Sequence, residues 1–145
     1  MTAQRQMTLM LDPTENLGWQ EAARLLKLLL QRCSDDEFLE FRLIDPRGRV
    51  SQHFISVPCL RRSKYVPDLG DVNGVANVYH SAIPRTQRRG TAEACGLANT
   101  TWADFDEGFP DDLPVAPSLV VESSPGKSQA YWLLKTPCAD LDRIE

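Results

Sequence analysis

The sequence predicts an α+β fold, in which one amphipathic helix is followed by antiparallel strands. Three observations support this prediction. Apolar residues recur at helical spacing near the N-terminus, runs typical of strands follow, and turns rich in proline and glycine separate those runs. The chain has 145 residues, 42% of them hydrophobic and 25% charged, which favours a single soluble globular domain.

The helix is expected over residues 13–33. Asp12 offers an N-cap, Pro13 suits the first helical position, and Glu15 completes a capping box. One face of this segment is apolar, with the spacing of a buried stripe. The residues of that stripe are Ala22, Leu25, Leu26, Leu29 and Cys33.

Strands and turns should make up the rest of the chain. Leu39, Phe41 and Leu43 alternate with polar residues, as in a half-buried strand, and a turn at residues 45–48 leads into a returning strand at 50–57. Further strands are expected at residues 75–83, 98–106, 118–123 and 129–134, with loops at 61–64 and 108–117 and a tight turn at 124–127.

The charged residues divide the chain into a basic middle and an acidic end. Residues 47–90 carry 8 basic and 2 acidic side chains, whereas residues 91–145 carry 3 basic and 10 acidic ones. This division fits one surface for phosphate and another for a divalent cation, or alternatively two ordinary solvated patches. Four separated cysteines, no signal peptide and no apolar run of membrane-spanning length favour reduced thiols in the cytoplasm, with no membrane partner.

The strongest candidate for chemistry is the pair Asp104 and Asp106. On a strand, residues i and i+2 point to one face, so both carboxylates should project together while Ala103 and Phe105 face the core. Paired carboxylates suit Mg²⁺ or Mn²⁺, as in enzymes that act on phosphates. The alternative is a strand edge that carries two ordinary surface acids.

A second candidate is the turn at residues 123–129. Its Gly126-Lys127-Ser128 looks like the end of a P-loop, but Val121 replaces the first glycine of that motif and a strand follows. We therefore interpret it as a hairpin turn that either receives phosphate oxygens or simply joins two strands.

A third candidate is a set of cations that either binds nucleic acid or is solvated loop charge, with Tyr79 and His80 as minor candidates for base stacking. The cations are Arg61, Arg62, Lys64, Arg85, Arg88 and Arg89.

Several motifs occur in a characteristic order between residues 74 and 135. They are Asn77-Val-Tyr-His-Ser-Ala-Ile-Pro-Arg85, Arg89-Gly-Thr-Ala-Glu93, Trp102-Ala-Asp-Phe-Asp106, Pro117-Ser-Leu-Val-Val-Glu-Ser-Ser-Pro-Gly126 and Ala130-Tyr-Trp-Leu-Leu134. This string resembles the RepB-like replication primases of plasmids and phages, members of the archaeo-eukaryotic primase (primase–polymerase) superfamily. Residues 1–70 contribute only a compatible helix and hairpin.

The resemblance implies one catalytic core over residues 1–145, with an N-terminal α/β module at 1–70 and an RRM-like antiparallel sheet at 71–135. Within that sheet it implies Asp104 and Asp106 as catalytic metal ligands. The nucleotide-binding turn would comprise Ser124, Gly126, Lys127 and Gln129, where Gln129 replaces the family's histidine.

The resemblance also implies metal-dependent primer synthesis from nucleoside triphosphates on a single-stranded DNA template, with a replicative helicase domain as a further partner. The family's third acidic motif is absent, so residues 136–145 would begin a missing C-terminal part or end a short form. The alternative functions are a non-catalytic module that binds single-stranded nucleic acid and, less favoured, a metal-dependent nuclease.

Overall fold

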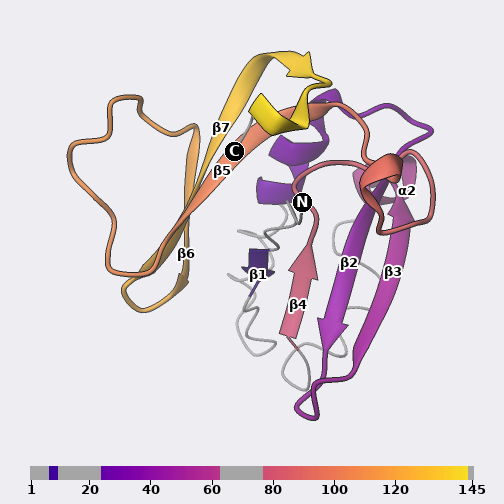
Figure 1. Ribbon diagram of the computed structural model, residues 1–145, viewed down its shortest axis with the longest axis horizontal. Coiled ribbons are helices and arrows are strands. Elements are labelled where there is room, and N and C mark those ends of the chain that lie inside the picture. The colour runs from indigo at the N-terminus through magenta and orange to yellow at the C-terminus, as the bar shows by residue number, and fades with distance from the viewer. Residues whose placement is uncertain (1–6, 10–23, 63–76, 144–145) are drawn as a thin grey trace.

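The computed structural model describes residues 7–9, 24–62 and 77–143, and it confirms the α+β prediction (Figure 1). One sheet has the strand order β1-β4-β2-β3 and the other has the order β5-β7-β6, with antiparallel pairing in both. The strands are β1 (Met7–Leu9), β2 (Phe38–Ile44), β3 (Val50–Ser56), β4 (Asn77–His80), β5 (Ala98–Phe105), β6 (Leu119–Ser124) and β7 (Lys127–Cys138). The short helices are η1 (Leu30–Arg32), α2 (Val57–Arg62), η3 (Ala92–Ala94) and η4 (Leu141–Arg143).

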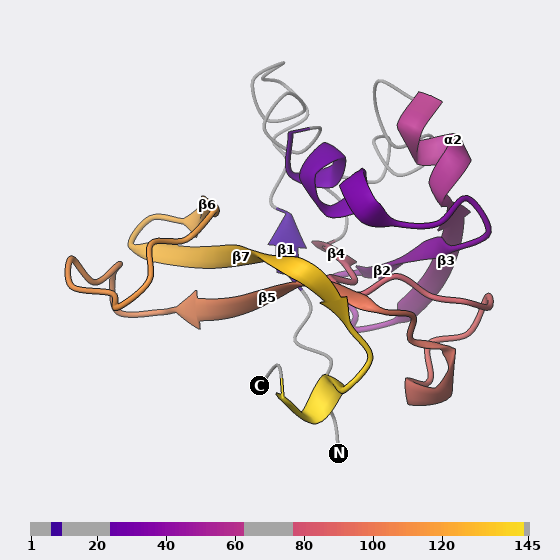
Figure 2. The ribbon, with the colours of Figure 1, turned by 90° about the horizontal axis from the view of Figure 1, so that it is seen from above.

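A helix at residues 24–29, continued by η1, packs against both sheets. Figure 2 shows it on the same side of the two sheets. Leu26 and Leu30 join the core of the four-stranded sheet, while Leu25 and Leu29 contact Tyr131 in the other sheet. The predicted apolar stripe is therefore buried where it is described, and the expected start of the helix at residues 13–23 lies outside the described residues.

The predicted hairpin is formed by β2 and β3. Leu39, Phe41 and Leu43 are buried, as their alternation predicts. Gly48 closes the turn with a φ of 79°, a conformation that glycine adopts without strain, and its N–H donates to the carbonyl of Asp45 at 2.9 Å.

Two predictions near this hairpin need correction. Residues 57–62 form α2 rather than the end of a strand and the start of a basic loop, and Pro58 suits the first turn of this helix. Arg61 then donates to the carbonyls of Leu30 and Cys33, so it holds α2 against η1. Ser63 and Lys64 lie outside the described residues.

Of the strand expected at 75–83, Asn77–His80 form β4, which pairs with β1 and β2. Residues 81–83 are not in a strand, and residues 75–76 lie outside the described residues. The resemblance implies that this segment belongs to the sheet at 71–135, whereas β4 lies between β1 and β2 in the four-stranded sheet. Among the described residues, no helix is long and apolar enough to cross a membrane.

The three-stranded sheet contains the other predicted strands, with β7 longer than expected. The loop between β5 and β6 projects from the sheet (Figure 1). Phe109 in this loop packs edge-to-face on Phe105, with the two ring centroids 5.2 Å apart. The carbonyl of Val115, in the same loop, accepts a hydrogen bond from Trp132 Nε1. This loop therefore contacts one face of the sheet, opposite the face that meets the helix at residues 24–29.

Candidate functional site

The pairing of β5 with β7 brings the acidic pair and the predicted turn together. Asp104 lies opposite Gln129, whose Nε2 donates a hydrogen bond to Asp104 Oδ1 at 2.9 Å. Asp106 follows the end of β5, and its Oδ1 lies 3.6 Å from Lys127 Nζ. We call Asp104, Asp106, Lys127 and Gln129 the acidic cluster.

The orientation predicted for the acidic pair needs correction. Trp102 has the same parity as Asp104 on β5, and it packs in the cluster formed by Tyr131 and the helix at residues 24–29. Asp104 therefore lies on the face of the sheet that meets the helix, whereas Phe105 points to the opposite face and meets the loop residue Phe109. The prediction reversed the two faces because both carry apolar residues.

Asp104 and Asp106 differ in exposure. Asp104 is half-buried, and 76% of the Asp106 side chain is exposed. Burial raises the pKa of the Tyr131 hydroxyl above its ordinary value, and the negative charge of Asp104 raises it further. A carboxylate close to this apolar cluster is less solvated than Asp106, so it interacts more strongly with a cation.

Gln129 provides an independent reason to expect a ligand beside Asp104. Only 9% of this residue is exposed, and its Oε1 is buried without a hydrogen-bond partner. This unpaired amide oxygen, the adjacent Asp104 carboxylate and Asp106 two residues further along the chain offer hard oxygen ligands, which fit Mg²⁺ or Mn²⁺. Among the described residues no group of three or more His, Cys, Asp or Glu side chains could hold a metal, so an ion here would take its remaining ligands from phosphate or water.

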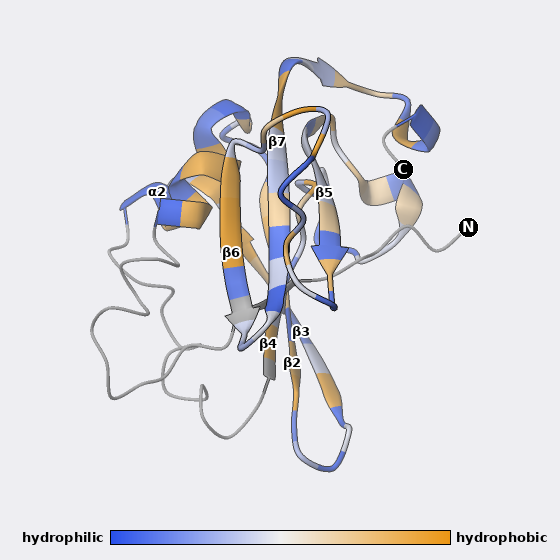
Figure 3. Cartoon of the chain, turned by 90° about the vertical axis from the view of Figure 1, so that its left-hand side faces the viewer, coloured by the Kyte–Doolittle hydropathy of each residue, from blue (hydrophilic) through white to orange (hydrophobic). Residues whose placement is uncertain are grey.

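The turn that joins β6 to β7 stands at the same end of the sheet. Ser124 pairs with Lys127, and Gly126 has a φ of 76°, which closes the tight hairpin. Figure 3 shows hydrophilic residues gathered at this end of β6 and β7. The structure thus brings the predicted nucleotide-binding residues to the end of the sheet that carries the acidic pair.

The three arginines predicted to bind nucleic acid have different environments. Arg85 is only 2% exposed, and its Nη2 lies 2.7 Å from Glu40 Oε2, so the prediction of a surface role for Arg85 is corrected. Arg88 is exposed, with its guanidinium 4.7 Å from the centre of the Phe38 ring. Arg89 is exposed as well.

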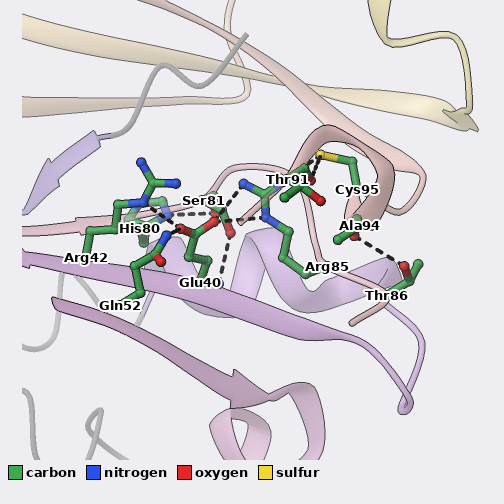
Figure 4. Close-up of polar contacts among 10 residues, drawn as sticks. All are labelled: Glu40, Arg42, Gln52, His80, Ser81, Arg85, Thr86, Thr91, Ala94 and Cys95. Atoms are coloured by element: carbon green, nitrogen blue, oxygen red, sulfur yellow. Dashed lines mark hydrogen bonds and ion pairs between the residues drawn. The ribbon is translucent and has the colours of Figure 1, made fainter. Parts of the chain in front are cut away.

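Sequence reasoning missed the partner of Arg85. Glu40 is 1% exposed, and its carboxylate also accepts hydrogen bonds from Arg42 Nε at 2.5 Å and Gln52 Nε2 at 2.9 Å (Figure 4). Its place between Leu39 and Phe41 in an alternating strand suggested a solvent-facing side chain. Arg42 could have indicated that Glu40 is paired, because residues two apart on a strand lie on the same face and the arginine can bind the carboxylate.

His80 is buried as well. The prediction that His80 stacks on a base is therefore wrong. Its Nδ1 donates to the carbonyl of Ser81 at 3.0 Å, and burial lowers the pKa of His80 to about 4. Tyr79 points to the opposite face of β4 and is only half-buried.

Comparison with protein-family models, with curated proteins and with solved structures found no match to this chain.

Proposed function

We propose that this chain is the metal- and nucleotide-binding part of a primase–polymerase nucleotidyltransferase that serves plasmid or phage DNA replication. The observation that supports it best is the acidic cluster. Asp104 and Asp106 lie within hydrogen-bond or ion-pair distance of Gln129 and Lys127, which come from a turn that the sequence marks separately as a phosphate-binding candidate.

In this proposal Asp104 and Asp106 hold Mg²⁺ or Mn²⁺, which offsets the charge of the triphosphate when it is bound. Lys127 exchanges its long contact with Asp106 for a phosphate oxygen. Gln129 fixes the orientation of the Asp104 carboxylate through its 2.9 Å hydrogen bond. The hydroxyl of Ser124 and the backbone at Gly126 provide further donors beside Lys127.

The proposed setting is the cytoplasm. All four cysteines are free thiols in the structure, which fits a reducing compartment.

The proposal is tested by titrating a fluorescent ATP analogue with and without Mn²⁺. Lys127→Ala should weaken binding about tenfold in Mn²⁺, because one charge-assisted contact is lost. Lys135→Ala is the matched control, since Lys135 is an exposed lysine on the same strand. Gln129→His, which restores the family residue, should strengthen binding. The proposal would be contradicted if the two lysine variants bound the nucleotide with equal affinity, or if the affinity of the wild type were the same with and without Mn²⁺.

A second candidate function is a non-catalytic module that binds single-stranded nucleic acid. The observation that favours it is the lack of a third acid beside Asp104 and Asp106 among the described residues. The two functions are distinguished by primer extension with Mn²⁺ and nucleoside triphosphates. Extension that disappears in Asp104→Asn supports the enzyme, whereas nucleic-acid binding with no extension supports the module.

A further inference from the structure

The four-stranded sheet has an outer face, turned away from the helix at residues 24–29. Leu39, Phe41 and Leu43 point to the core, so the residues between them point outward. Arg42 lies opposite Gln52 on β3 and opposite Tyr79 on β4. These three residues therefore form one row across the strands on the outer face.

The segment at residues 88–90 lies against the same face. Arg88 Nη1 donates to the carbonyl of Phe54 at 2.9 Å, which fixes the start of the segment on β3. A Cβ on Gly90 would lie 2.7 Å from Gln52 Nε2 and 3.0 Å from Arg42 Nη2, so only a glycine allows the backbone to come this close to the row. Figure 2 shows the segment on the side of the sheet opposite the helix.

The charge around this face is positive. Arg88 and Arg89, in the segment that lies against this face, are both exposed, and the acids among the described residues 38–56 and 77–90 are Glu40 and Asp45. Glu40 is buried among arginine and glutamine donors, and Asp45 pairs with Arg49. Arg89 is exposed, and its guanidinium has no hydrogen-bond or ion-pair partner among the described residues.

We propose that this outer face binds a single-stranded nucleic acid through Tyr79, Arg88 and Arg89, while Arg42 and Gln52 hold the buried Glu40 beneath them. The arginines at 88 and 89 contact the phosphodiester backbone, and the half-buried ring of Tyr79 stacks on a base. An aromatic ring beside exposed cations is the arrangement that binds single strands, since a duplex offers no exposed base faces. The inference rests on the proposed function only for the use of the strand as a template.

Fluorescence anisotropy with labelled oligothymidylate and oligouridylate of about 20 nucleotides measures the binding, in EDTA and without nucleotide so that the acidic cluster is not involved. Arg89→Glu should weaken binding about tenfold and flatten the dependence of log K on log salt by about 0.7 or more. Tyr79→Leu should weaken binding about fivefold with the slope unchanged, and Tyr79→Phe should bind as wild type because it keeps the ring.

Arg62→Glu is the matched control, because it makes the same charge change in α2 on the opposite side of the sheet. It should alter affinity less than about twofold, as an exposed charge away from the bound strand does. The proposal is overturned if Arg62→Glu loses as much affinity as Arg89→Glu, if Tyr79→Phe and Tyr79→Leu weaken binding equally, or if a duplex probe binds more tightly than either single strand. The proposal is supported if Arg89→Glu and Tyr79→Leu lose affinity for both oligonucleotides or for one of them. A difference between the two oligonucleotides shows whether the protein distinguishes deoxyribose from ribose.

Discussion

The two sheets of this protein treat their carboxylates in opposite ways. On the four-stranded sheet, Glu40 is 1% exposed, and both of its oxygens accept hydrogen bonds from arginine or glutamine. On the three-stranded sheet, Asp104 accepts one hydrogen bond from Gln129, and Asp106 makes a 3.6 Å contact with Lys127. The carboxylate of Glu40 is saturated by the protein, whereas the acidic cluster retains capacity for a ligand.

This difference separates a structural role from a binding role. A buried carboxylate must have donors around it, because an unpaired charge in the interior is costly. The half-buried Asp104 and the exposed Asp106 have few donors, and they can exchange these for a cation at little cost. We therefore expect substitutions around Glu40 to change stability, and substitutions in the acidic cluster to change ligand binding.

The largest effect on stability is expected for Arg85→Met, which leaves Glu40 buried without its main cation. The free energy of unfolding should fall by about 3–5 kcal/mol in urea titrations followed by circular dichroism. The double variant Glu40→Met/Arg85→Met should be more stable than Arg85→Met, since it removes the uncompensated charge. A loss below about 1 kcal/mol for the single variant would show that the pair is not structural.

A second effect on the four-stranded sheet is a pH dependence that His80 controls. In the folded state its pKa is about 4, against an ordinary value of 6.5, so the unfolded chain binds more protons between these values. Stability should therefore decrease as the pH falls from 6.5 towards 4, by about 1.4 kcal/mol for each pH unit. In His80→Gln this slope should be smaller, while the other titrating groups stay the same. If the urea midpoints of the wild type and of His80→Gln change by the same amount between pH 6.5 and pH 4, His80 is not the cause of the pH dependence.

A smaller loss is expected for Gly90→Ala. The added Cβ would meet Gln52 Nε2 at 2.7 Å and Glu40 Oε1 at 2.8 Å, and both atoms are held by their mutual hydrogen bond. The cost should be about 1–3 kcal/mol, as for other overpacked sites. In a Gln52→Ala background the same substitution should cost less. If the cost is equal in both backgrounds, the contact with Gln52 is not its cause.

The smallest effect on stability is expected for Lys127→Ala. Its contact with Asp106 is long, and 55% of the lysine side chain is exposed, so the free energy of unfolding should change by less than about 0.5 kcal/mol. The contrast with Arg85→Met sharpens the difference between the two sheets. If Lys127→Ala lowered the free energy of unfolding as much as Arg85→Met does, the ion pair of Lys127 with Asp106 would have a structural role.

Much of this fold follows from local sequence patterns. The alternation of Leu39, Phe41 and Leu43 predicts a half-buried strand because it depends only on which side chains avoid water. The turn at Gly126 likewise predicts the pairing of β6 with β7, whereas the approach of Asp104 and Gln129 depends on the pairing of β5 with β7.

The parts that could not be predicted depend on contacts between distant segments. Arg85 looks like a surface cation until the fold places Glu40, 45 residues earlier in the chain, against it. The helix α2 is short, and it is held by contacts of Arg61 with carbonyls about 30 residues away. Alternation identifies the two faces of β5, but it does not tell which of them meets the helix.

Binding of a divalent cation by the acidic cluster can be measured by calorimetric titration with Mn²⁺. Asp104→Asn/Asp106→Asn is compared with Asp111→Asn/Asp112→Asn, which removes the same charge from two exposed acids in the loop before β6. We expect the variant of the acidic cluster to lose at least about tenfold in Mn²⁺ affinity, and the loop variant to bind Mn²⁺ as the wild type does. Equal Mn²⁺ binding by the wild type and both variants, or an equal loss in both variants, would contradict this expectation.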